Sequence, residues 1–206
     1  EVAILKESME VQDTMERAGM TFVKGIMSGK EVVVVRSGIG KVNMGICAQI
    51  LIDCFGVDTL INTGVAGSLD ADINMDVSML GDPVGQIPRM DTFSFPADEK
   101  LVKLAVEVNK EVNPDIQTFT GRVLSGDQFI SGKEKKEYLV KTFDGKCAEM
   151  EGAAMAQTAY LNKVSYVIIR AISDKADNSA TMDYPEFEKQ AIAHSVALVK
   201  ELLPMI

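Results

Sequence analysis

Residues Val164–Ile172 read VSYVIIRAI, an apolar and β-branched run that predicts a strand buried inside a sheet. Two shorter runs have the same character, namely Glu31–Arg36 (EVVVVR) and Asp58–Asn62 (DTLIN). Longer segments with helical spacing of their apolar residues separate these runs, as in Ala97–Val112. Because buried strands alternate with amphipathic helices, the sequence predicts an α/β fold. We expect a single domain over residues 1–206, since no linker or repeat divides the chain.

The remaining elements follow from the same periodicities. Gln117–Leu124 alternates like a strand, and the glycine-rich Thr63–Gly67 (TGVAG) is expected to be a loop. Further helical patterns cover Glu1–Met9, Val42–Phe55, Gly132–Phe143, Glu151–Leu161 and Pro185–Leu203. Ser68–Pro88 contains no clear strand, so it is either a long irregular loop or a place where residues are missing.

Composition restricts the kind of partner. The chain has 206 residues, with 30 acidic and 21 basic side chains and a formal net charge of −9. No run of lysine and arginine offers a basic patch, so nucleic acid is not expected as a partner. No apolar run is long enough to span a bilayer, so no membrane association is expected. The cysteines Cys47, Cys54 and Cys147 form no CxxC pair, which indicates reduced cytoplasmic thiols, with Cys47 and Cys54 in the core.

Glycine-rich turns follow the predicted strands, where open α/β sheets bind their ligands. Ser37–Lys41 (SGIGK) contains GxG without the third glycine of a dinucleotide fingerprint, so a tight strand-to-helix turn is favoured over a nicotinamide site. Thr63–Gly67 is either a packing turn or a place where a ligand approaches backbone N–H groups closely. Phe129, within GDQFI, is either a core residue or a stacking surface for a flat ring.

Three carboxylates adjoin strongly apolar sequence. Glu149 and Glu151 precede an alanine-rich helix, and Asp174 follows the strand that ends in RAIS. Burial raises carboxyl pKa values toward those of a general acid that works near neutrality. The only histidine, His194, falls inside the last helix, so neither a histidine-dependent triad nor a metal site is expected. Two carboxylates beside an aromatic side chain suit cleavage of a glycosidic bond.

A set of motifs occurs together, namely SGIGKVN (residues 37–43), INTGVAGSL (61–69), SGDQFI (125–130), AEMEGAAMA (148–156) and VIIRAISDKAD (167–177). In this order and at this spacing, almost the whole chain resembles the bacterial 5′-methylthioadenosine/S-adenosylhomocysteine nucleosidases of the nucleoside phosphorylase superfamily. The resemblance implies a twisted mixed β-sheet flanked by helices and a homodimer. It also implies hydrolysis of the bond between adenine and a 5′-thio-substituted ribose, without metal or organic cofactor, in methionine salvage.

The resemblance also implies roles for individual residues. Asp174 would protonate adenine N7, with Ser173 helping to position it and Arg170 close to the same carboxylates. Glu151 would hold the ribose hydroxyls. The water-activating base of the family is a glutamate immediately before a helix that begins with valine, which corresponds to Glu1 here. The implied substrate pocket is lined by Ile39, Ala66, Gly67, Phe129, Ile130, Glu149, Met150 and Tyr184.

Two places depart from the pattern of the family. The opening strand is absent before Glu1, and a histidine-containing strand segment is absent where the chain passes from Asn74 to Met75. We therefore expect roughly a dozen residues to be missing at that junction, more than loop-length variation explains. Beyond the junction, Val77, Leu80 and Pro88 match residues that reach the alkylthio pocket of the neighbouring subunit.

Two other functions stay open. A purine nucleoside phosphorylase would share the scaffold, but it needs arginines that converge on a phosphate, and only Arg36 lies near the SGIGK turn. A non-catalytic module that binds adenine nucleosides is conceivable if the missing segments are truly absent from the protein.

Overall fold

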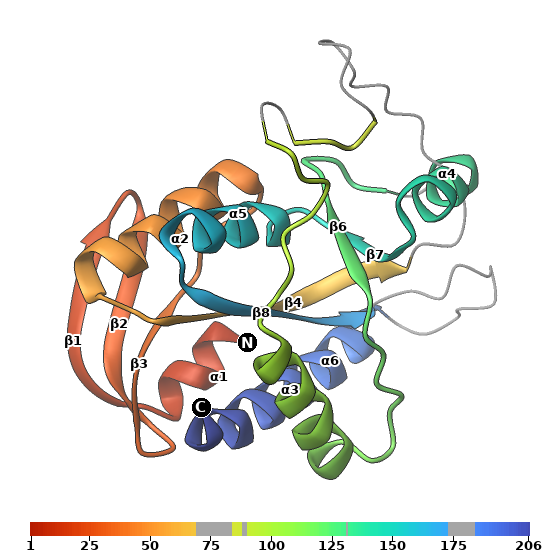
Figure 1. Cartoon of the computed structure of the whole chain (residues 1–206). Helices are drawn as coiled ribbons and strands as arrows, with labels where there is room; N and C mark the ends of the chain where they lie inside the picture. Colours follow the sequence, from red (N-terminus) through yellow and green to blue (C-terminus); the bar gives the residue numbers. More distant parts are fainter. Residues whose placement is uncertain (69–83, 88–89, 131, 173–183) are drawn as a thin grey trace.

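The computed structural model describes residues 1–68, 84–87, 90–130, 132–172 and 184–206, with Ser68, Lys133 and residues 184–187 described by their backbone alone (Figure 1). The junction between Asn74 and Met75 lies outside the described residues.

The strands form two sheets. An antiparallel sheet has the order β1–β2–β3, with β1 at Glu10–Arg17, β2 at Met20–Met27 and β3 at Lys30–Val35. A mixed sheet has the order β6–β7–β4–β8, with β4 at Thr59–Ser68, β6 at Arg122–Ser125, β7 at Gly145–Glu149 and β8 at Ser165–Ile172. In it β4 and β8 are parallel, β6 and β7 are parallel, and β4 runs antiparallel to β7. The prediction of an α/β fold is thereby confirmed.

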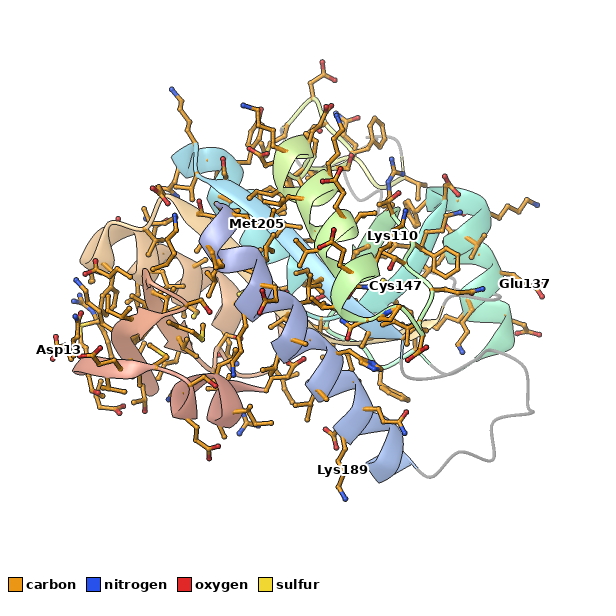
Figure 2. The ribbon with its side chains drawn as sticks, turned by 90° about the horizontal axis from the view of Figure 1, so that it is seen from below. Asp13, Lys110, Glu137, Cys147, Lys189 and Met205 are labelled. Carbon is orange, nitrogen blue, oxygen red and sulfur yellow. The ribbon has the colours of Figure 1, made fainter. Side chains whose placement is uncertain are left out.

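Helices cover both faces of the central strands β4 and β8 (Figure 1). They are α1 (Val2–Glu7), α2 (Lys41–Phe55), α3 (Glu99–Val112), α4 (Lys133–Phe143), α5 (Gly152–Asn162), α6 (Tyr184–Leu202) and the 3₁₀ helix η1 (Leu203–Met205). Leu60 and Tyr166 pack against α2 and α5, whereas Ile61 and Ile169 pack against α3 and α6. This alternation is the side-chain period of buried strands. Figure 2 shows α3 and α6 side by side on the second face.

The first helix is held by the last one. Leu5 of α1 shares a buried cluster with Val196 and Val199 of α6 and with Leu203 of η1. The Lys30 ammonium also donates to the backbone carbonyl of Ile206 at 2.5 Å. The packing of α1 therefore decides where Glu1, the residue before it, lies relative to the central sheet.

The structure corrects several expectations about individual elements. Thr63–Gly67 is not a loop, because β4 continues through it and pairs with β8 and then with β7. Only the end of Gln117–Leu124 is a strand, and β1, β2 and β7 were not predicted. Cys47 and Cys147 are buried, but Cys54 is exposed on α2, where its sulfur lies 3.5 Å from Arg17 Nη1. The predicted helices are present to within two residues at each end.

Candidate active site

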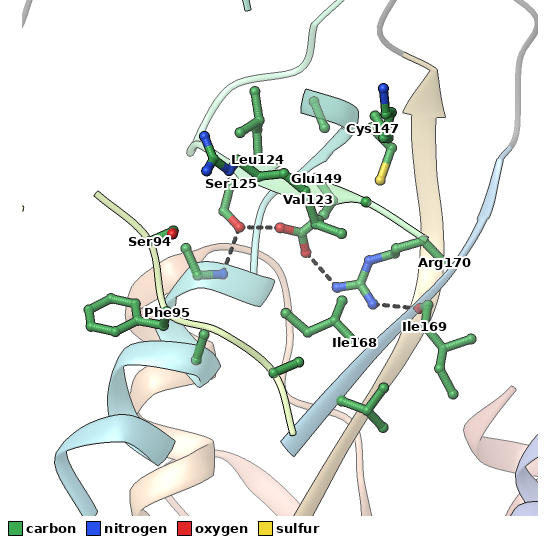
Figure 3. Close-up of a pocket in the computed structure, with 18 of the residues that line it drawn as sticks. Ser94, Phe95, Val123, Leu124, Ser125, Cys147, Glu149, Ile168, Ile169 and Arg170 are labelled. Atoms are coloured by element: carbon green, nitrogen blue, oxygen red, sulfur yellow. Dashed lines mark hydrogen bonds and ion pairs between the residues drawn. The ribbon is translucent and has the colours of Figure 1, made fainter. Parts of the chain in front are cut away.

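A buried ion pair occupies the ends of β7 and β8 (Figure 3). Arg170 Nη2 lies 2.5 Å from Glu149 Oε2, and the two side chains are only 4% and 2% exposed. A charge removed from water to this extent is costly unless it is paired and hydrogen-bonded. Glu149 is therefore buried among polar donors rather than in purely apolar surroundings, and its compensating charge is Arg170.

Both oxygens of the Glu149 carboxylate accept further hydrogen bonds. The Ser125 hydroxyl donates to Oε1, and the backbone N–H groups of Glu151 and Gly152 donate to Oε2 at 3.1 and 2.7 Å. Ser125 in turn accepts from the backbone N–H of Ala153 at 2.7 Å. Glu149 and Ser125 thus satisfy the backbone N–H groups at the start of α5, which have no partner inside the helix.

The Arg170 guanidinium is anchored from the other side by β4. Its Nη1 donates to the carbonyl of Asn62 at 3.1 Å and to that of Ile169 at 2.8 Å, and its Nη2 also donates to the Asn62 side chain. Its Nε is buried and has no hydrogen-bond partner among the described residues. The planar fork of the guanidinium is therefore fixed in orientation between β4 and β7.

Two loops meet the N-terminus of α2. Glu151 Oε1 accepts from the backbone N–H of Gly40 at 2.7 Å, and Asp127 Oδ1 accepts from that of Lys41 at 2.8 Å. The Lys41 ammonium lies 3.5 Å from Asp127 Oδ2. Carboxylates are favoured here because the first N–H groups of a helix are unpaired and carry partial positive charge. The turns SGIGK, GDQFI and EMEG are consequently joined to one another.

Glu1 reaches the same strand that anchors Arg170. The hydroxyl of Thr63 donates to Glu1 Oε1 at 3.3 Å, and Thr63 directly follows Asn62 on β4. A hydrogen-bonded series therefore runs from Glu1 to β4, then through Arg170 and Glu149 to the turn that carries Glu151.

The other residues expected in the pocket differ in exposure. Phe129 is 88% exposed and Ile39 is 71% exposed, so Phe129 is not a core residue. Ala66 is buried, and Gly67 pairs with Ala148 of β7 in the sheet. Ile130 and Met150 are partly buried. The side chains of Ile39 and Phe129 are therefore accessible to a ligand that binds beside the joined turns.

A large cavity opens next to the ion pair. Its volume is about 1710 Å³, and Ser125, Ile130, Glu149, Arg170 and Ile172 contribute to its lining. The sequence did not identify Ser125, Asn62, Thr63 or Asp127 as site residues. Their signal is their position in recognised motifs: Ser125 ends β6 and Asp127 lies in the turn after it, whereas Asn62 and Thr63 lie inside β4 within INTGVAGSL.

The Cys147 thiol lies near the ion pair (Figure 3). Burial raises its pKa to about 11, with opposing smaller effects of Arg170 and Glu149. The thiol is therefore protonated near neutrality and is a poor nucleophile. His194 is half-buried on α6, where its backbone carbonyl accepts from Asn113 at 3.1 Å.

Several predicted site residues fall where the structure gives no description. Ser173, Asp174, Val77, Leu80 and Pro88 lie outside the described residues, and Tyr184 begins α6 without a described side chain. In the described part of the chain, no helix is long and apolar enough to cross a membrane. The same residues contain no group of three or more histidine, cysteine, aspartate or glutamate side chains placed to hold a metal ion.

Comparison with known proteins extends over the whole chain. The family described as the phosphorylase superfamily matches residues 1–204. The 5′-methylthioadenosine/S-adenosylhomocysteine nucleosidase of Staphylococcus carnosus is 37% identical, and the match covers 98% of this chain and 94% of that protein.

Solved structures have the same fold. The 5′-methylthioadenosine/S-adenosylhomocysteine nucleosidase from Neisseria meningitidis, in complex with methylthio-immucillin-A, matches with a TM-score of 0.88 and 32% identity over 100% of this chain and 94% of that one. Futalosine hydrolase of Helicobacter pylori matches with a TM-score of 0.86 and 32% identity, and the match covers 100% of this chain and 93% of that one. The expected twisted mixed sheet flanked by helices is thus confirmed as a nucleoside phosphorylase-like fold.

Proposed function

Because this chain belongs to the phosphorylase superfamily, and within it to the 5′-methylthioadenosine/S-adenosylhomocysteine nucleosidases, we propose that it hydrolyses the N-glycosidic bond of these two nucleosides. As a member of that family it is an N-glycosyl hydrolase. Water is the only co-substrate, and the products are adenine and the corresponding thio-ribose. The reaction serves methionine salvage in the cytoplasm, and three free thiols are compatible with a reducing compartment.

The observation that carries the proposal is the hydrogen-bonded series from Glu1 to Glu151. It brings carboxylates from the first residue, from β7 and from the start of α5 to one region around Arg170. Glycoside hydrolysis needs carboxylates on both sides of a sugar whose transition state resembles an oxocarbenium ion. The convergence of these groups supports that chemistry.

In the proposed mechanism one carboxyl group protonates the leaving base and another takes a proton from the attacking water. Asp174, which Ser173 helps to position, donates a proton to adenine N7 as the bond to C1′ breaks, so that adenine leaves as a neutral base. Glu1 accepts a proton from the water that attacks C1′, and Arg170 lies close to these carboxylates. Glu151 holds the ribose hydroxyls, and its negative charge stabilises the developing sugar cation.

The base and the sugar are held by the turns around the carboxylates. Phe129 stacks on adenine while the backbone of Ile130 contacts the hydrogen-bonding edge of the base. Met150 packs on the face of the ribose, and Ala66 and Gly67 line the sugar and the base. Ile39 lines the alkylthio end, and Tyr184 lies over the purine. The exposure of Phe129 and Ile39 supports this assignment, because both side chains are available to a ligand.

We also propose that the protein is a homodimer. Val42 and Ile46 expose apolar side chains four residues apart at the start of α2, and Ile39 exposes one in the turn before it. Exposed apolar residues that cluster on a surface mark sites of interaction, which supports this proposal. In such a dimer Val77, Leu80 and Pro88 would complete the alkylthio pocket of the neighbouring subunit. Sedimentation equilibrium tests the dimer, which a monomer at assay concentration would contradict.

The experiment that tests the function measures release of adenine from methylthioadenosine and from S-adenosylhomocysteine in phosphate-free buffer. We expect turnover with water alone. Turnover that requires phosphate would assign a phosphorylase instead, and binding without consumption would assign a non-catalytic module. Futalosine is assayed in parallel, because the futalosine hydrolase structure matches this chain with nearly the same TM-score as the nucleosidase structure. Asp174→Asn should keep binding and lose most turnover, and a near-normal rate would refute the assignment of the acid.

A further inference from the structure

We propose that Glu149 is a positioning residue, which, together with Ser125, fixes Arg170 and the turn that carries Glu151. The inference rests on the proposed function, and it replaces the expectation that Glu149 binds the substrate directly. It concerns how the proposed site is held in shape from inside the protein.

The first argument is that the Glu149 carboxylate is already bound by several protein donors and is shielded from a substrate. An ionised carboxylate offers about four acceptor positions. Here Ser125, Arg170 and the backbone N–H groups of Glu151 and Gly152 supply four donors. The side chain is also only 2% exposed, so a ribose hydroxyl could reach it only by displacing one of these partners.

The second argument concerns Arg170. Its side chain is 4% exposed, and within hydrogen-bond distance its only anionic partner among the described residues is Glu149. Removing one member of a buried ion pair leaves the other charge uncompensated, which is more damaging than removing both. Without Glu149 the guanidinium would therefore leave its position on Asn62 or draw water into the site.

The third argument concerns Glu151. The same oxygen of Glu149 that binds Arg170 accepts from the Glu151 N–H and the Gly152 N–H. These bonds set the backbone of the turn, and the Glu151 side chain then reaches Gly40 at 2.7 Å. One carboxylate thus fixes both Arg170, which lies among the carboxylates of the proposed site, and Glu151, which is proposed to hold the ribose hydroxyls.

Ser125 completes the arrangement. Its hydroxyl donates to Glu149 and accepts from Ala153, so its proton position is determined. The next residue, Gly126, donates its N–H to the Glu149 carbonyl at 3.0 Å. Ser125→Ala therefore removes one contact of the carboxylate without removing a charge, which makes it the milder test of the same idea.

The test compares Glu149→Gln, Ser125→Ala and the double variant with Glu99→Gln, whose wild-type side chain is exposed and forms a surface ion pair with Lys103. Glutamine keeps the size of the side chain, but it removes the charge and turns one acceptor into a donor. For each variant we would measure kcat and KM for methylthioadenosine, the dissociation constant of adenine by calorimetry, and thermal unfolding.

We expect kcat of Glu149→Gln to fall by about 100-fold, because displaced catalytic groups cost about that much. Adenine affinity should stay within about twofold, because the proposed base contacts come from Phe129 and Ile130. Ser125→Ala should lower kcat by about tenfold and add little in the double variant, since coupled residues are not additive. Glu99→Gln should behave as wild type.

Other outcomes overturn the inference. A raised KM with unchanged kcat in Glu149→Gln would make Glu149 a substrate ligand, and adenine affinity that falls in parallel with kcat would make its role purely structural. If Glu149→Gln does not fold, Ser125→Ala decides by the same measurements. An active wild type with unaffected variants refutes only the positioning role, whereas a wild type that releases no adenine refutes the proposed function and this inference with it.

Discussion

Gly152 should not tolerate a side chain, because the Glu149 carboxylate packs directly against it. A Cβ added at Gly152 would lie 2.9 Å from Ile168 Cδ1, and 3.0 and 3.2 Å from the two carboxylate oxygens of Glu149. Non-bonded carbon atoms prefer separations of about 3.5–4.0 Å. The end of Ile168 can rotate away, but Glu149 is held by several donors and cannot retreat without lengthening its hydrogen bonds.

The size of the effect of Gly152→Ala follows from two opposing contributions. Overpacking of this kind costs about 1–3 kcal/mol. Alanine regains up to about 1 kcal/mol of helix propensity, and less at the first helical residue than in the interior. We therefore expect a net loss of ~1–2 kcal/mol, which lowers Tm by ~2–8 °C for a chain of this length. Turnover should fall by about tenfold, since Arg170 and Glu151 shift with the carboxylate.

Gly45→Ala is the matched control. Gly45 lies inside α2, and a Cβ there would meet only Thr158 Oγ1, at the ordinary contact distance of 4.0 Å. This variant should gain up to about 1 kcal/mol, because alanine is the better helix former. Differential scanning calorimetry and adenine release are measured on both variants. If Gly152→Ala melts at or above the wild-type temperature with full turnover, the close packing of Glu149 on α5 is wrong.

Three further perturbations have definite expected outcomes. Phe129→Ala should weaken adenine binding in calorimetry by ~1–3 kcal/mol if the exposed ring stacks on the base, and an unchanged affinity would remove Phe129 from the site. Asp98→Ala should cost ~1 kcal/mol in urea unfolding, because Asp98 caps α3 through the N–H groups of Lys100 and Leu101. The Leu101 N–H chiefly holds the pKa of Asp98 below its usual 3.8, so this difference between wild type and variant should persist above that value and fade as pH falls through the lowered pKa. A thiol reagent at pH 8 should label exposed Cys54 first, and labelling of a Cys54→Ser variant at an equal rate would contradict its exposure.

The fold was predictable where local pattern and burial agree. Val164–Ile172 is apolar and β-branched, and β8 occupies Ser165–Ile172 as the neighbour of β4. The TGVAG segment has poor strand propensity, yet it is a strand because its backbone pairs with β8 and β7 on the two sides. Strand propensity is largely a matter of context, so pairing partners distant in sequence decided this segment.

The two hairpins of the first sheet were missed for a different reason. Residues of β1 (EVQDTMER) are polar and mostly exposed, which gives no alternation of buried and exposed side chains. The turns use Ala18–Gly19 and Ser28–Gly29, in which both residues have positive φ. Asparagine or aspartate before glycine would be the strong signal for such turns, and alanine and serine are weak ones.

The charged residues Glu149 and Arg170 could be singled out from the sequence, but the residues that hydrogen-bond to them could not. Glu149 stood out because a carboxylate beside apolar residues must be compensated. The serine that binds it is 24 residues away in sequence, and the asparagine that anchors Arg170 is 108 residues away from that arginine. Sheet order brings these residues together, and that order depends on the whole chain. The roles of Asp174 and Glu1 came from the family resemblance and stay predictions.

The packing of α1 on α6 has a consequence for synthesis on the ribosome. Leu5 is translated well before its apolar partners Val196, Val199 and Leu203. Because translation adds ~5–20 residues per second, α1 remains for about 10–40 s without the surface of α6 that buries it. Glu1, the proposed base, therefore reaches its place beside Thr63 only after α6 and η1 have been made, and a nascent chain released before that point should be inactive.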